Sequence, residues 1–272
     1  MCESSGQYGE ESVMALKKDS FMGTMIFTVT LCLLCSFMIT GTAEVLKERK
    51  LVKKRDELMR NVLIAADVDL SGDKDFRALF AKDVKPLLVS LDSGDVDTSG
   101  VNVMDYDPRM ASINPETSIK LEKKQDKAKI KTRANQVRVF KVFDDSGKLT
   151  SVVLPIYGKG LWSMVYGFIA VKPDLNTIEN VVFYEHGETP GIGDFLNDTE
   201  WTNQWRNKQI FDEKGKVSFK VVKGGAKEGD VHGIDAVSGA TMTGRGVQRS
   251  IQFWFGSEGF EAFFKKLKAS EV

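Results

Sequence analysis

An uncharged stretch limits what this chain can fold into more than any other feature of its sequence. From Ser20 to Ala43 there is no charged residue, and Met, Ile, Phe, Val, Leu and Thr dominate. A helix of this length spans the hydrocarbon core of a bilayer. We therefore predict an N-terminal tail over residues 1–19 and one transmembrane helix over residues 20–43.

A cleaved signal peptide is the alternative interpretation of the same stretch. Lys17 and Lys18 would form its charged region, and the small residues Gly41 to Ala43 would form its cleavage site. The residues that follow favour a retained helix, because an apolar stripe continues through Glu44 to Arg60 without Pro or Gly.

The composition is that of a globular protein with balanced charge. The 272 residues include 38 basic and 38 acidic side chains, so we expect no nucleic-acid partner. Cysteine occurs only at positions 2, 32 and 35, and we interpret Cys32 and Cys35 as small packing residues of the membrane helix.

A helical and irregular extension is predicted over residues 44–135. Within it, Asp73 to Val89 carries apolar residues at helical spacing, with Pro86 near the end. Residues 90–131 are polar and have few apolar anchors, so we interpret them as a long surface excursion.

The remaining part, residues 136–272, is predicted to be an α+β domain with a mainly antiparallel sheet and flanking helices. Short β-rich runs follow one another in pairs, the first at 137–143 and 149–156, the second at 166–171 and 178–185. Strands paired with their sequence neighbours, with the helices set apart from them, are typical of this class.

The segment from Asp235 to Thr243 carries the strongest functional signal. It places an acid, three hydroxyl groups and several small residues just before an amphipathic helix that we expect to begin near Thr243. The hydroxyl groups belong to Ser238, Thr241 and Thr243. Gly239 and Ala240 allow close approach to the backbone, and a helix start favours an anion, so the segment suits a phosphate. A simple helix cap made by one of the hydroxyl groups is the alternative.

Three stretches of the sequence resemble a family of flavin-bearing proteins. Asp235 to Thr241, with the pattern Asp-x-x-Ser-Gly-Ala-Thr, is similar to the site at which a flavin transferase joins FMN to a threonine through a phosphodiester. That site occurs in the FMN-binding domains of sodium-translocating NADH:quinone reductases and of the related Rnf complexes. Tyr157 to Met164 and Glu185 to Gly193 resemble two further segments of these domains. The Lys-Gly-Leu-Trp form of the first makes the C subunit of the sodium pump a closer match than the Rnf protein.

The resemblance implies a covalent FMN on Thr241. Around the attachment point it implies Asp235, Ser238, Gly239, Ala240 and Thr243. For the walls of the ring pocket we expect Leu161, Trp162, Glu188, Thr189 and Gly191. Electron transfer through a flavin needs no general base or nucleophile, so we expect neither a catalytic residue nor a metal ligand.

Some residues of the predicted ring pocket have a second interpretation. Trp162 also suits an ordinary core position, and Glu188 also suits a salt contact with Lys159. Gly158 and Gly160 are expected to let the backbone approach the ring.

The function implied by the resemblance is electron transfer within a sodium-pumping NADH:quinone oxidoreductase that reduces ubiquinone. Its partners would be the other subunits, the flavin transferase and the membrane. An Rnf-type protein and a non-redox, membrane-anchored scaffold are the alternatives. The family places the large domain on the periplasmic side of the bacterial inner membrane, whereas the basic residues from Lys47 to Arg55 favour the cytoplasmic side. We follow the resemblance, because the charge rule weakens when a long domain crosses.

Overall fold

The computed structural model describes residues 20–72 and 75–270, and these form two compact units. One unit ends at Lys54 and the other begins at Arg55. The predicted N-terminal tail over residues 1–19 lies outside the described residues.

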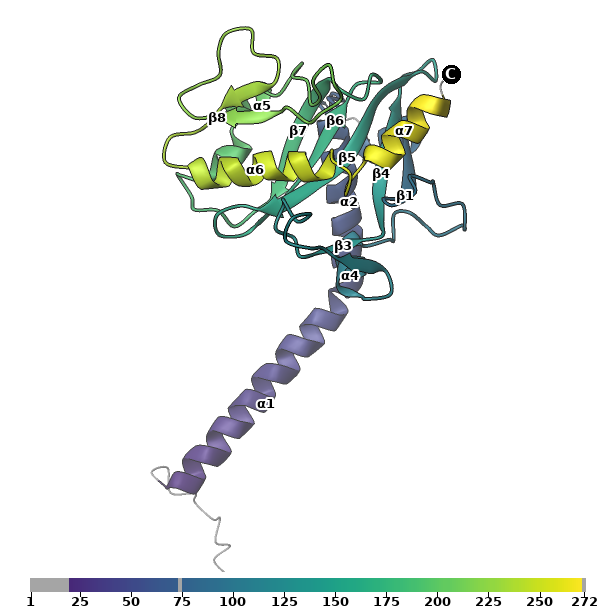
Figure 1. Cartoon of the computed structure of the whole chain (residues 1–272). Coiled ribbons are helices and arrows are strands. Elements are labelled where there is room, and N and C mark those ends of the chain that lie inside the picture. The colour runs from purple at the N-terminus through teal and green to yellow at the C-terminus, as the bar shows by residue number, and fades with distance from the viewer. Residues whose placement is uncertain (1–19, 73–74, 271–272) are drawn as a thin grey trace, which may run out of the picture. The chain divides into compact units, whose positions relative to one another are not determined.

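The first unit is helical. It contains α1, Phe21–Val45, and the beginning of α2, Lys47–Ala65 (Figure 1). No residue of α1 is buried. Among the described residues, α1 is the one helix whose length and composition suit a membrane crossing.

The second unit is built on a five-stranded antiparallel sheet with the strand order β1-β4-β5-β6-β7. The strands are β1 Val84–Ser90, β4 Gln136–Phe143, β5 Leu149–Lys159, β6 Met164–Val171 and β7 Ile178–Glu185. The two predicted strand pairs correspond to β4 with β5 and β6 with β7. The predicted class, an α+β fold with a mainly antiparallel sheet and a preceding apolar helix, is confirmed.

Shorter elements surround this sheet. They are α3 Phe76–Asp83, α4 Pro108–Ile113, β2 Ser118–Lys120, β3 Thr132–Ala134, the 3-10 helix η1 Asp194–Asn197, α5 Thr199–Asn203, β8 Lys220–Val222, β9 Gly233–Asp235, α6 Thr241–Trp254 and α7 Glu261–Ser270. β2 pairs with β3, and β8 pairs in parallel with β9.

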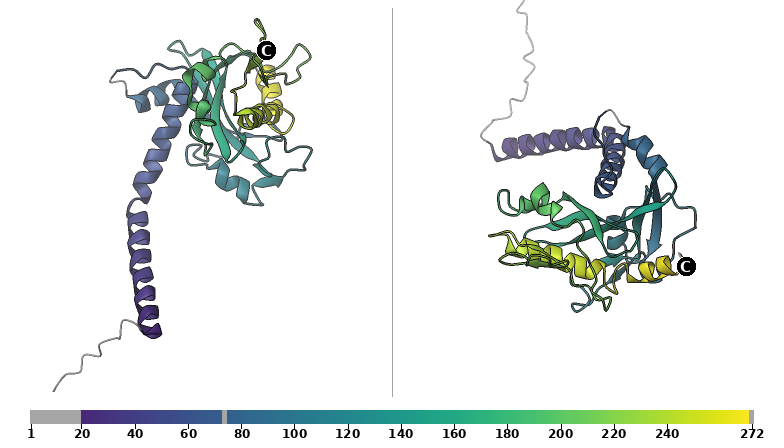
Figure 2. Two further views of the ribbon diagram at one scale, coloured as in Figure 1. Left: turned by 90° about the vertical axis from the view of Figure 1, so that its left-hand side faces the viewer. Right: turned by 90° about the horizontal axis from the view of Figure 1, so that it is seen from above.

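Apolar side chains cover both faces of the sheet. On one face, α6 and α7 contribute Val247, Ile251 and Phe263 to the larger core cluster. On the other face, the C-terminal part of α2 contributes Val62 and Leu63 to a second cluster. Figure 2 shows the sheet between these helices. The strands are therefore held from two sides, as a sheet with two apolar faces requires.

The helix predicted over residues 73–89 corresponds to α3 only as far as Asp83, and its first two residues lie outside the described part of the chain. α3 ends at Asp83, and Val84–Ser90 forms β1, which pairs with β4 along its whole length. Pairing and burial override the local helical spacing at this point. Pro86 fits because β1 is an edge strand, where a missing N–H costs no ladder bond to a second neighbour.

Candidate functional site

Three segments meet at the N-terminus of α6. They are the loop between β5 and β6 (residues 160–163), the loop after β7 (residues 186–193) and the turn before α6 (residues 236–240). Glu188 bonds to the first loop and to α6, and a side chain on Gly239 would contact Ile192. The sheet and α6 thus bring together the three stretches that carry the family resemblance.

The start of α6 is an open helix end. Ala240 is the N-cap residue, and Gly239 precedes it with a φ of +82°. Among the described residues, no side chain caps this turn, so the alternative interpretation as a hydroxyl cap is wrong. The helix also begins at Thr241, two residues earlier than expected. Uncapped N–H groups at a helix start attract an anion.

The two threonines of this first turn have different surroundings. Thr243 is 2% exposed, and its hydroxyl donates a hydrogen bond of 2.5 Å to Glu188 Oε2. Thr241 is half-buried and lines a hollow of about 320 Å³. Of these two threonines, only Thr241 therefore lies beside a space that can take another molecule.

The hollow at Thr241 is rich in basic side chains. Its lining consists of Val221, Lys223, Ala236, Thr241, Arg245, Gln248 and Arg249. Thr241, Arg245 and Arg249 follow one another at a spacing of four residues, so they share one face of α6. Arg249 Nε is buried and has no hydrogen-bond partner among the residues that the structure describes. This donor set suits a phosphate group.

The carboxylate of Glu188 is buried among hydrogen-bond donors. It is 5% exposed and accepts from the backbone N–H groups of Leu161, Trp162 and Ser163 at 3.0–3.1 Å. Burial raises the pKa of this carboxyl, but the bonds from Thr243 and from the three N–H groups outweigh burial. The pKa therefore lies below its ordinary value, and Glu188 is ionised at neutral pH.

Apolar side chains surround the start of α6 at the surface. Trp162 is 66% exposed, Ile192 53%, Met242 46% and Leu161 43%. The interpretation of Trp162 as a core aromatic is therefore wrong. Exposed apolar side chains grouped around an anion site provide a surface for a flat, partly apolar ligand.

Comparisons with known proteins agree with this geometry. Residues 160–256 match the family model described as an FMN-binding domain. The chain is 39% identical over 259 residues to the C subunit of the Na(+)-translocating NADH-quinone reductase of Vibrio alginolyticus, covering 95% of this chain and all of the relative. It is 37% identical over 253 residues to that of Haemophilus ducreyi, covering 93% and 96%.

The chain belongs to the family of the C subunits of Na(+)-translocating NADH-quinone reductases.

Solved structures support this assignment. The crystal structure of NqrC from Shewanella oneidensis is 67% identical and covers 80% of this chain and 99% of that one, with a TM-score of 0.77. The C subunit from Parabacteroides distasonis is 26% identical, with a TM-score of 0.60 and coverage of 79% and 94%.

Within this family fold, several predicted site residues support the site indirectly. Asp235 Oδ1 accepts from the Ala226 N–H at 2.7 Å, and the Asp235 N–H donates to Gln204 Oε1 at 2.9 Å. Asp235 thus holds the loop after β8, which carries Lys223. Thr189 and Gly191 are exposed in the loop after β7, and Gly191 has a φ of +78°. Ser238 is exposed in the turn before α6.

One expectation about the loop between β5 and β6 is corrected. Lys159 Nζ donates to the Trp162 carbonyl, so the salt contact with Glu188 is not formed. A Cβ on Gly158 would collide with Ser250 Oγ, and one on Gly160 would lie 2.6 Å from Glu188 Oε1. Both glycines therefore allow close internal packing against Ser250 and Glu188, and the approach of a ring to their backbone stays a prediction.

Sequence reasoning missed some residues at this site. Lys223 and Gln248 line the hollow, and Gln248 Oε1 accepts from the Val221 N–H at 2.9 Å, which holds β8 against α6. No spacing in the sequence indicates this contact, because β8 reaches α6 only through tertiary packing. Ile192 and Met242 were also missed, although an exposed apolar residue beside a glycine-rich motif is a usable signal.

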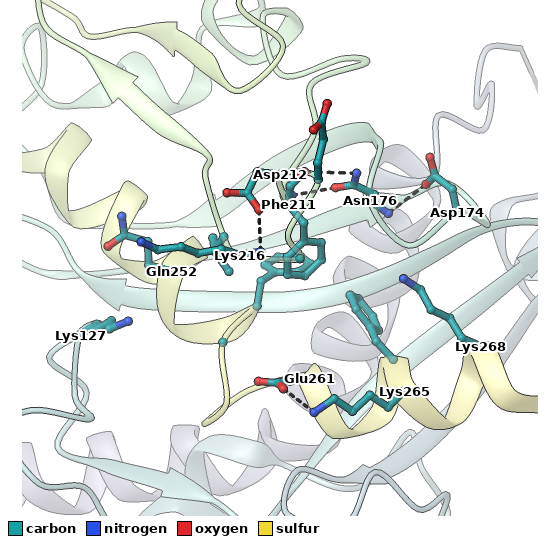
Figure 3. Close-up of a pocket in the computed structure, with 16 residues that line it drawn as sticks. Lys127, Asp174, Asn176, Phe211, Asp212, Lys216, Gln252, Glu261, Lys265 and Lys268 are labelled. Carbon is teal, nitrogen blue, oxygen red and sulfur yellow. Dashed lines mark hydrogen bonds and ion pairs between the residues drawn. The ribbon is translucent and has the colours of Figure 1, made fainter.

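A larger hollow of about 810 Å³ lies among other elements and contains none of the predicted site residues (Figure 3). Phe211, Phe255 and Phe264 contribute its aromatic side chains. Glu261 is paired with Lys265 at 2.5 Å, and Asp212 accepts from the N–H of Lys216 at 2.9 Å. These charged side chains stabilise local structure and point to no specific ligand.

Proposed function

We propose that this protein carries electrons through an FMN joined to Thr241 by a phosphodiester. The observation that carries the proposal is the difference between the two threonines. Thr241 lines a basic hollow at an open helix start, whereas the Thr243 hydroxyl is buried and bonded to Glu188. A hydroxyl that an enzyme modifies has to be accessible.

The residues around Thr241 fit the phosphate of such a cofactor. A phosphodiester keeps one negative charge, which the start of α6 and the side chains of Lys223, Arg245 and Arg249 stabilise. Arg249 Nε, which has no partner of its own, is a donor available to it. Attachment bonds the Thr241 oxygen to the phosphorus of an FMN that is activated as a phosphoanhydride, such as a flavin dinucleotide. The anhydride P–O bond breaks, the nucleotide part leaves with the bridging oxygen, and the hydroxyl proton goes to solvent.

The protein's contribution is to bind and orient the ring. FMN supplies the redox chemistry when bound. Leu161 and Trp162 offer apolar surface, and Thr189 and Gly191 offer polar and backbone groups from the facing loop. Ser238, Gly239 and Ala240 keep the attachment turn small. Residues 136–272 would then be the FMN-binding domain, preceded by the extension over residues 44–135.

The proposed partners follow from family membership and from α1. The chain would work with the other subunits of the sodium pump, receive its flavin from a flavin transferase and be anchored by α1 in the bacterial inner membrane. We place the large domain on the periplasmic side. The basic residues after α1 oppose this orientation, but a long translocated domain weakens that rule.

The hydroxyl assignment is tested by producing the chain together with its flavin transferase. Thr241→Val removes the oxygen nucleophile and keeps the shape, so the denatured protein should lose its in-gel flavin fluorescence. It should also lose the added mass of one FMN less one water.

Thr243→Val is the matched control and should stay fluorescent. It lies in the same helical turn and loses the same oxygen. A fluorescent Thr241→Val together with a dark Thr243→Val would move the attachment by two residues. A wild-type chain without added mass would exclude the covalent flavin altogether.

A further inference from the structure

Glu188 is a buried carboxylate with no basic partner among the described residues. Its negative charge is stabilised instead by hydrogen bonds, as in a backbone anion nest. Oε1 accepts from the N–H groups of Trp162 and Ser163 at 3.1 and 3.0 Å and lies 3.3 Å from the Ser163 hydroxyl. Oε2 accepts from the Leu161 N–H at 3.1 Å and from the Thr243 hydroxyl at 2.5 Å.

These donors come from two separate parts of the fold. Leu161, Trp162 and Ser163 lie in the loop between β5 and β6, whereas Thr243 lies in the first turn of α6. Glu188 itself lies in the loop after β7. One carboxylate thus joins the loops after β5 and β7 to the start of α6.

The surrounding packing leaves little freedom at this junction. A Cβ on Gly193 would lie 2.7 Å from Glu188 Cβ, and one on Gly160 would lie 2.6 Å from Glu188 Oε1. Glycine at both positions lets the carboxyl reach between the loops. Its acceptor capacity is then used by protein donors, so it has none to spare for a ligand.

We propose that Glu188 is a positioning residue that acts on the flavin only through the loop between β5 and β6. It pins the backbone of Leu161 to Ser163 to the start of α6, and thereby holds the exposed side chains of Leu161 and Trp162 beside the attachment point. The inference rests on the proposed function, because it assigns these side chains to the flavin. It differs from the expectation that Glu188 lies in the wall of the ring pocket.

The first test needs no flavin and therefore does not depend on the proposed function. In chain made without the transferase, Glu188→Gln replaces an acceptor oxygen by an NH₂ group that faces donors. Amide hydrogen exchange at residues 161–163 should become about tenfold faster, which is the effect of losing a charged hydrogen bond. Glu213→Gln, which neutralises an exposed carboxyl outside the site, is the control and should leave these amides unchanged. Unchanged exchange in Glu188→Gln would show that Glu188 does not hold the loop between β5 and β6.

The second test uses the flavin-loaded chain. Glu188→Gln should keep covalent flavin, because Thr241 is untouched, but its flavin absorption should shift and iodide should quench its fluorescence more strongly. Thr243→Val should shift the spectrum in the same direction. Thr243→Ser, which keeps the hydroxyl, should restore the wild-type spectrum.

The outcomes separate the two claims. If exchange rises but the spectrum and the quenching stay as in the wild type, the loop does not place the ring and the positioning role is wrong. If neither the wild type nor any variant carries flavin, the proposed function fails. The exchange result still decides whether Glu188 holds the loop between β5 and β6. If Glu188→Gln does not fold, Thr243→Val and Thr243→Ser are compared instead. Their amide exchange at residues 161–163 decides whether the hydrogen bonds hold the loop, and their flavin spectra decide whether the loop positions the ring.

Discussion

At the residue scale, the site depends on an ionised carboxylate held away from water. Four hydrogen bonds from Leu161, Trp162, Ser163 and Thr243 keep the pKa of Glu188 below its ordinary value despite its burial. A carboxyl with a lowered folded-state pKa stabilises the fold above its unfolded-state pKa. This stabilisation is lost as the pH falls through the folded-state value.

The pH dependence of stability should therefore change when Glu188 is replaced. At neutral pH, Glu188→Gln should lower the free energy of unfolding by about 1.5–3 kcal/mol, the range for hydrogen bonds to charged groups. The difference from the wild type should shrink as the pH falls through about 4.3, the pKa of an unfolded-state glutamate, and on towards the lower folded-state pKa of Glu188. Denaturant unfolding of both proteins at several pH values measures this difference in the free energy of unfolding. A difference that shrinks already between about pH 7 and 6 would contradict the assignment to Glu188.

At the element scale, α6 carries the attachment turn and packs closely against the end of β5. A Cβ on Gly246 would lie 2.5 Å from the Lys159 carbonyl oxygen and 2.9 Å from Gly160 Cα. A Cβ on Gly244 would meet only the Val221 side chain, at 3.3 Å. Two glycines of one helix thus differ in what a methyl group would meet.

Gly246→Ala should destabilise the chain by about 1–3 kcal/mol, because backbone atoms cannot move aside as a side chain can. Gly244→Ala is the matched control and should change stability by less than about 1 kcal/mol, since the gain in helix propensity offsets a small shift of Val221. Thermal unfolding of the detergent-solubilised chain compares them. Equal midpoints would show that α6 does not pack closely against β5.

At the scale of the whole molecule, α1 is the element that suits a membrane anchor. It is apolar, it has no buried residue and its length suits a bilayer. If α1 is retained, it would keep the large domain close to the membrane.

The chain should therefore stay with membranes after alkaline or high-salt washing, and its mature N-terminus should lie upstream of Lys17. N-terminal sequencing of the washed membrane fraction checks both points. A shortened soluble form that begins near Glu44 would instead support the cleaved signal peptide.

The sequence by itself determined the features that depend only on residues close together in the chain. Uncharged length predicted α1, and short β-rich runs predicted the pairs β4–β5 and β6–β7. The motif ending at Thr241 was recognisable because it is one short continuous segment. The covalent attachment to Thr241 stays a prediction.

Only the tertiary structure decided which distant residues meet. Val84–Ser90 became a strand because β4 offers it a partner, against its helical spacing. Glu188 accepts hydrogen bonds from the loop between β5 and β6 and from the Thr243 hydroxyl. The sequence alone suited a salt contact of Glu188 with Lys159 equally well. Lys223 joined the hollow through β8. Such contacts depend on how the sheet and α6 pack together, and the local sequence pattern carries no record of that packing.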